Sequence, residues 1–275
     1  MNRQLMTLVK REFWEHRSLW IAPMAVAGFF LAAAICAAVF ASSFGSPIFG
    51  NHISVHSPAR FGPLDENPAL IGLMGLAAQV FLVSFITCLV YLLDCLYSER
   101  KDRSILFWKS MPVSDASTVL VKFTVAMVIV PLAVYVLTTV VYALIYGVLA
   151  LGVPSFAQFT ASVGPADWLD AQVKLLGMIT ASQLWYAPIG VWFMLASVAS
   201  RRAPFLMASM PWVAAGIAES IVFHTSHVWQ FMGNRLRPQP DLWHALSLPD
   251  LWMGLVVAAG MLYMVIRLRR YRDDT

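Results

Sequence analysis

Long apolar stretches separated by short runs of charged residues form the main pattern of this 275-residue chain. A membrane-spanning helix needs roughly 20 consecutive apolar residues, and six stretches approach that length. Because lipid offers no hydrogen-bond partner to an open backbone, all six are predicted to be helices. The predicted spans cover residues 19–40, 70–93, 119–151, 175–199, 205–223 and 249–267. The predicted fold is an all-α integral membrane protein, with residues 1–275 forming one transmembrane domain.

The third stretch is longer than one membrane crossing requires. At about 1.5 Å per residue it would extend roughly 50 Å as a helix, against a hydrocarbon core of about 30 Å. It could form one long tilted helix kinked at Pro131, or two short spans. Two short spans would make seven crossings and would reverse the side of every later loop.

Basic residues distinguish these alternatives, because short cytosolic loops retain Lys and Arg. With six spans and a cytosolic N-terminus, all but four of the 19 Lys and Arg residues fall on the cytosolic side. The exceptions are Arg60, Lys174, Arg235 and Arg237. Seven spans would instead move the four C-terminal arginines outside. The distribution therefore favours six spans with both termini in the cytosol.

Composition agrees with a membrane protein. Hydrophobic residues make up 59% of the chain, charged residues make up 12%, and mean hydropathy is +0.69. A soluble domain has about 25% charged residues. The net charge of +4 could suggest a nucleic-acid partner, but the sequence contains no DNA-binding or RNA-binding motif. Basic cytosolic loops next to anionic lipid explain this charge, so membrane lipid is an expected partner and nucleic acid is not.

Motifs for catalysis and metal binding are absent from the sequence. It contains no GxxxxGK[ST] phosphate loop, no HExxH zinc helix and no GxSxG nucleophile turn. Two histidine pairs, His52 with His56 and His224 with His227, lack a third ligand nearby in the sequence. We therefore expect no catalytic residue, no metal site and no cofactor bound by this chain, and we expect the chain itself to be no enzyme.

Glu219 is the distinctive charge inside a predicted span, in the sequence PWVAAGIAESIVF. An ionisable group at that depth suggests a function, because burying it without compensation costs several kcal/mol. Its partner could be His224, the Ser220 hydroxyl or a helix end. A structural glutamate that accepts backbone N–H bonds is the alternative. The other spans carry almost no charge and the two halves show no clear repeat, which disfavours a proton-driven or sodium-driven secondary transporter.

A charged segment at residues 94–122, DCLYSERKDRSILFWKSMPVSDASTVLVK, separates the second and third spans. Its first part mixes charged and apolar residues and predicts a short surface helix with one apolar face. Pro112 would end this helix, and Ser114 would cap the next helix with Asp115 in its first turn. The two helices would form a rigid corner at the cytosolic face, which could transmit a push from a partner.

An amphipathic helix is predicted before the first span, over residues 3–17. Leu8 and Phe13 recur at helical spacing opposite Lys10 and Arg17. Such a helix is expected to lie on the membrane surface.

Three patches of the sequence resemble one family. The segment LYSERKDRSILFWKSMPVSD, at residues 96–115, is similar to the signature of permease subunits of type-two ABC exporters, in the bacterial branch of six-span half-size subunits. The segment KREFWEHRS, at residues 10–18, resembles the elbow helix of that branch. Glu219 followed by Phe223 and His224 resembles its fifth span. The resemblance covers nearly the whole chain in layout and is specific mainly in these patches.

The resemblance implies a permease subunit of an ATP-driven exporter in the bacterial cytoplasmic (inner) membrane. Two cytosolic ATPase subunits would hold ATP and Mg²⁺, and a second copy or a homologous permease subunit would complete the complex. The substrate would be hydrophobic or amphipathic, such as a drug, lipid or peptide. Residues 225–250 would form short re-entrant helices in the outer leaflet. The loop at residues 41–69 is longer than in the shortest family members.

The resemblance also implies roles for named residues. An ATPase-coupling helix would contain Glu99, Arg100, Lys101, Asp102, Arg103, Ile105, Phe107, Trp108 and Lys109. The elbow helix would contain Arg11, Phe13, Trp14 and Arg17. A non-transporting scaffold or signalling subunit would share the coupling loop and stays open as an alternative. A membrane-embedded enzyme would need paired polar catalysts at one depth, and the sequence shows none.

Overall fold

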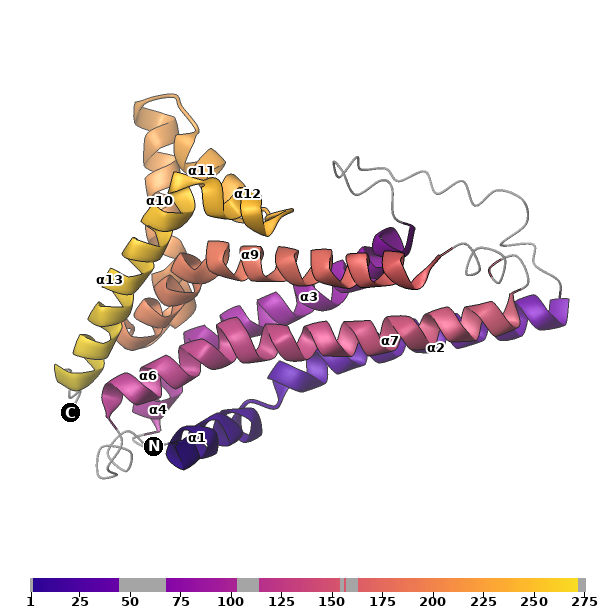
Figure 1. Ribbon diagram of the computed structural model, residues 1–275. Coiled ribbons are helices and arrows are strands. Elements are labelled where there is room, and N and C mark those ends of the chain that lie inside the picture. Colours follow the sequence, from indigo (N-terminus) through magenta and orange to yellow (C-terminus); the bar gives the residue numbers. More distant parts are fainter. Residues whose placement is uncertain (1, 45–67, 103–113, 154–155, 157–162, 272–275) are drawn as a thin grey trace. The chain divides into compact units, whose positions relative to one another are not determined.

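The computed structural model describes residues 2–44, 68–102, 114–153, 156 and 163–271. All regular elements in these residues are helices, as predicted (Figure 1). In chain order they are α1 (Asn2–Glu15), α2 (Ser18–Phe44), α3 (Pro68–Asp94), α4 (Tyr97–Lys101), α6 (Asp115–Thr124), a π-helical turn (Val125–Ile129), α7 (Val130–Gly152), α9 (Pro165–Ala199), α10 (Pro204–Val222), α11 (His227–Arg235), α12 (Leu242–Ser247) and α13 (Pro249–Tyr271).

Among the described residues, five helical segments are long and apolar enough to cross a membrane. They are Ser18–Ala41, Gly72–Lys101, Asp115–Gly152, Pro204–Val222 and Pro249–Tyr271. Each of these segments overlaps one of the predicted spans, and together they are those of a multi-pass membrane protein.

The remaining predicted span, residues 175–199, is helical but does not belong to these five segments. It forms the C-terminal part of α9, which begins ten residues earlier than predicted, at Pro165. Polar residues such as Gln183 and Tyr186 lower the mean hydropathy of this part of α9. A sixth crossing therefore stays a prediction.

The long third stretch is one continuous helical segment from Asp115 to Gly152, so the single-helix alternative is the one that the structure adopts. The π-helical turn ends at Ile129, two residues before Pro131. Proline has no N–H to donate and its ring crowds the carbonyl of the preceding turn. A widened turn at this place accommodates the proline without ending the helix. Ser114 caps the segment as predicted, because its hydroxyl accepts the backbone N–H of Ser117 at 3.1 Å.

The chain divides into two compact units. Unit 1 comprises Met1–Leu19, Ile86–Val130 and Met178–Thr275, and unit 2 comprises Trp20–Phe85 and Pro131–Gly177. Within unit 1, α1, α4, the start of α6 and the C-terminal end of α13 lie at the same end (Figure 1). Helix termini that are distant in the sequence are therefore gathered in one place.

Unit 2 contains a close approach between α2 and α7. A Cβ atom built on Gly152 would lie 2.5 Å from the Cβ and 3.0 Å from the Cα of Ala38. Elsewhere in the unit, the rings of Tyr142 and Trp168 stack with centroids 5.5 Å apart. Small residues at a contact let membrane helices approach closely, which is how such helices gain packing energy.

We expect Gly152→Ala to destabilise the protein by about 1–3 kcal/mol, because the new methyl group meets the Ala38 backbone and one helix must shift. Gly147→Ala on the same helix is the matched control. No heavy atom of the described residues lies within 4 Å of a Cβ built there, so this variant gains up to about 1 kcal/mol of helix propensity. Thermal unfolding in detergent measures the stability of both variants. Equal melting temperatures for Gly152→Ala and Gly147→Ala would contradict the close contact between α2 and α7.

Candidate functional site

The short helix α4 follows α3 and begins the charged segment between the second and third predicted spans. The residues immediately after it, 103–113, lie outside the described residues. Two sets of contacts hold α4 within unit 1, one to the connection between α9 and α10 and one to a buried cluster of charges.

The first set joins α4 to the C-terminal end of α9. The Ser197 hydroxyl accepts the backbone N–H groups of Leu96, at 3.2 Å, and Tyr97, at 3.0 Å. In return, the Arg100 guanidinium donates to the carbonyls of Ser197, at 2.6 Å, and Ser200, at 2.8 Å. Helix ends carry backbone donors and acceptors without intrahelical partners, and here each end satisfies the other. The two helix ends are therefore clamped together.

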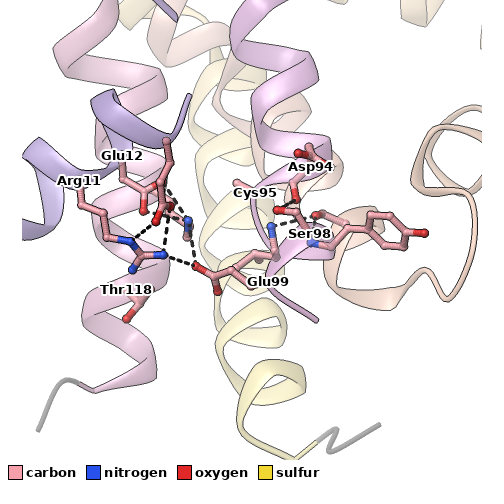
Figure 2. A network of polar contacts seen from close by, with 12 residues as sticks. Arg11, Glu12, Asp94, Cys95, Ser98, Glu99 and Thr118 are labelled. Carbon is pink, nitrogen blue, oxygen red and sulfur yellow. Dashed lines mark hydrogen bonds and ion pairs between the residues drawn. The ribbon is translucent and has the colours of Figure 1, made fainter. Parts of the chain in front are cut away.

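The second set starts from Glu99, whose side chain is only 6% exposed. Its Oε1 lies 3.1 Å from Lys122 Nζ and 3.5 Å from Arg11 Nη2. Its Oε2 lies 2.9 Å from Arg269 Nη1. Figure 2 shows Arg11 and Glu99 directed toward each other from α1 and α4. One carboxylate of α4 thus contacts α1, α6 and α13.

Lys122 lies at the centre of the cluster and is only 1% exposed. Its ammonium nitrogen is 2.9 Å from each carboxylate oxygen of Glu12 in α1. The Tyr91 hydroxyl of α3 donates to Glu12 Oε2 at 2.8 Å. Buried charges are costly unless they are paired and hydrogen-bonded. These contacts supply that pairing and fix α1 against α3 and α6.

Further pairs lie at the edge of this arrangement. Arg269 Nε donates to Asp115 Oδ1 at 3.2 Å, and Arg11 Nε donates to Glu15 Oε1 at 2.6 Å. Burial lowers the pKa of His16, whose ring packs edge-on against Tyr91. We call the charged set the ionic cluster. Its members are Arg11, Glu12, Glu99, Asp115, Lys122 and Arg269.

A group of three possible metal ligands, Glu12, Glu15 and His16, lies beside the cluster with ligand atoms within 4.8 Å of one another. Lys122 and Tyr91 already contact the Glu12 carboxylate, and Arg11 contacts Glu15. The carboxylates of Glu12 and Glu15 therefore take part in ion pairs and hydrogen bonds within unit 1.

The structure separates the predicted coupling residues into two kinds. Glu99 and Arg100 make contacts within the chain, so they hold α4 in place. Lys101 and Asp102 are exposed. The remaining predicted members lie outside the described residues: Arg103, Ile105, Phe107, Trp108 and Lys109.

The predicted elbow is helical, but it ends at Glu15, so Arg17 lies beyond it. Phe13 is half-buried, Trp14 is exposed and Arg11 belongs to the ionic cluster. The sequence patterns did not single out Glu12. The sequence did contain a signal for its burial, because Glu12 lies four residues after Leu8 and therefore on the apolar face of the helix.

Glu219 binds the N-terminal end of α11. Its Oε1 accepts the Thr225 hydroxyl at 2.6 Å and the His227 backbone N–H at 2.8 Å, and its Oε2 accepts the Val228 N–H at 2.7 Å. Of the predicted partners, the structure therefore pairs Glu219 with a helix end, because its carboxylate caps backbone N–H groups at the start of α11. The Ser220 hydroxyl instead donates to the carbonyl of Gly216.

His224, the third predicted partner of Glu219, has a different role. It adopts a left-handed backbone conformation, with φ of 51°, in the turn between α10 and α11. This turn brings Thr225 and the first residues of α11 back to Glu219. The two short helices α11 and α12 lie where re-entrant helices were expected, between α10 and α13.

Comparisons with protein-family models, curated proteins and solved structures find no match to this chain. In the candidate site, α4 contacts α1, α6, α9 and α13.

Proposed function

We propose that this chain is the membrane permease subunit of an ATP-driven ABC exporter and that α4 passes the movement of a cytosolic ATPase to the membrane helices. Two ATPase subunits bind ATP and Mg²⁺ and hydrolyse the nucleotide. A second copy of the chain, or a homologous permease subunit, completes the complex. The cargo is a hydrophobic or amphipathic molecule such as a drug, lipid or peptide.

The observation that carries this proposal is the set of contacts made by α4. Through Glu99 it contacts three helices, and through Arg100 and Ser197 it is clamped to a fourth. Coupling between distant sites is carried by rigid elements and by networks of hydrogen bonds and ion pairs. A displacement of α4 therefore acts on several membrane helices together, as an exporter driven from outside the membrane requires.

The segment that follows α4 in the sequence has the residue types expected of a contact with the ATPase. Residues 103–109 come one residue after the end of α4 and combine basic residues with Phe107 and Trp108. Aromatic side chains and Arg are the usual anchors of protein interfaces. The resemblance to exporter permeases rests on the same segment. It also supports six spans, with α9 as the fourth, and both termini in the cytosol of a bacterium.

We expect the double substitution Phe107→Ala with Trp108→Ala to lower recovery of the ATPase subunit roughly 30-fold in an affinity purification of the full-length chain, as loss of an interface hot spot does. The matched control replaces Phe231 and Trp243, which are exposed on α11 and α12, by Ala. That control should recover the ATPase as the unchanged chain does. Equal recovery of the ATPase subunit with the unchanged chain and both double variants would contradict a coupling role for the loop. Gel filtration of each variant verifies that the protein is folded.

A further inference from the structure

Three exposed basic residues lie around the clamp between α4 and α9. Arg201 and Arg202 form the turn between α9 and α10, and Lys101 ends α4. The Tyr97 hydroxyl of α4 donates to the carbonyl of Arg202 at 3.0 Å, which brings α4 to this turn. We call these residues the basic turn: Lys101, Arg201 and Arg202.

The backbone of the basic turn is held from both sides. Arg100 donates to the carbonyls of Ser197 and Ser200 before the two arginines, and the Ser200 hydroxyl accepts the backbone N–H of Ala203 after them, at 3.1 Å. A fixed backbone lowers the entropy that the arginines lose on binding a ligand. Both side chains nevertheless remain exposed.

The basic residues of the ionic cluster have acidic partners, whereas the three residues of the basic turn form none of the ion pairs found among the described residues. Lys122 and Arg269, for example, are paired with carboxylates of the ionic cluster. Asp102, next to Lys101, is also exposed and takes part in none of those ion pairs. The basic turn therefore offers positive charge to a ligand from outside the chain.

An exposed apolar surface begins immediately after the basic turn. Phe205 is 65% exposed and Leu206 is 52% exposed, and both belong to the first turn of α10. Helix α10 is one of the segments apolar enough to cross a membrane. Basic residues thus adjoin an apolar surface at the place where α10 would enter the lipid.

We propose that the basic turn binds the phosphate group of an anionic phospholipid, whose acyl chains lie along Phe205 and Leu206. The arginine guanidinium is planar and presents paired N–H donors that match the oxygens of a phosphate group. Basic residues next to a membrane attract anionic lipid, and the apolar surface supplies the contact that a soluble phosphate lacks. Lys101 also belongs to the predicted ATPase-coupling residues, but the lipid site itself needs only the chain and lipid, so it can be tested without the ATPase.

The test is native mass spectrometry of the full-length chain purified in detergent and titrated with phosphatidylglycerol or phosphatidylcholine. We expect tighter binding of phosphatidylglycerol, and Arg201→Gln with Arg202→Gln should weaken it about 25-fold, since each basic residue near a membrane contributes a factor of about five. The control, Arg267→Gln with Arg270→Gln, removes two exposed arginines that lie beside Tyr271 at the end of α13. This control removes the same amount of positive charge, so it should weaken phosphatidylglycerol binding clearly less than Arg201→Gln with Arg202→Gln does.

Glycerol phosphate distinguishes a lipid site from a general phosphate site, because it has the charged group without acyl chains. It should not displace the bound phosphatidylglycerol at millimolar concentration. Three results would each overturn the proposal. They are displacement of phosphatidylglycerol by glycerol phosphate, equal binding of the two lipids, and an equal loss of phosphatidylglycerol binding in the two double variants. Gel filtration and thermal melting verify that both variants are folded.

Discussion

Lys122→Met is expected to lower the free energy of unfolding by about 3–5 kcal/mol, because it leaves the buried carboxylates of Glu12 and Glu99 without their shared cation. The methionine fills a similar volume, so packing contributes little of the loss. Denaturation of the purified full-length chain in mixed detergent micelles measures the effect.

Two further variants show whether the loss comes from uncompensated charge. Lys174→Met removes a lysine whose partner Asp170, at 2.8 Å, is as exposed as the lysine itself. This change should cost no more than about 0.5 kcal/mol. Adding Glu12→Gln to Lys122→Met should recover part of the stability, because one unpaired charge is then removed as well. A double variant less stable than Lys122→Met, or a Lys174→Met loss of the same size, would contradict the buried pairing.

Glu219→Ala is the second change expected to have a large effect, and it should lower the free energy of unfolding by about 2–3 kcal/mol. The carboxylate accepts hydrogen bonds from Thr225, His227 and Val228, and bonds to a charged acceptor are the stronger kind. The loss should be local, since these contacts join α10 to the start of α11. Hydrogen exchange of the backbone amides of His227 and Val228 should become much faster in the variant.

Ser220→Ala provides the control for this second prediction. Its hydroxyl donates to the carbonyl of Gly216 one turn earlier in the same helix, so its removal should leave the exchange of His227 and Val228 unchanged. Unaltered exchange in Glu219→Ala would show that this carboxylate does not hold the turn. The intramembrane glutamate would then again require another explanation, such as contact with a transported molecule.

The helices could be predicted from the sequence because the signals that define them are local. The lengths of the apolar stretches located five of the candidate spans. The cap at Ser114 could be predicted because serine is a preferred residue immediately before the first turn of a helix. The predicted start of α9 was ten residues late, because polar residues such as Gln172 and Lys174 precede its apolar part. They are compatible with a helix although they interrupt an apolar run.

The site could be located from the sequence only in part, because its contacts join distant segments. Lys122 was counted among the cytosolic loop charges, although its partner Glu12 lies 110 positions earlier and both are buried. Hydropathy and helical periodicity carry no information about such pairing. Arg100 was predicted to face an ATPase, and the carbonyls that it binds could not be identified without the fold.

In the proposed function, an ATPase acts on the membrane helices through α4. Affinity purification of the tagged full-length chain from the membranes of its own host, followed by mass spectrometry, tests this claim most directly. We predict that a subunit with a GxxxxGK[ST] phosphate loop co-purifies and that the recovered complex hydrolyses ATP. Recovery of folded chain without such a subunit, or ATP hydrolysis by the purified chain alone, would contradict the claim.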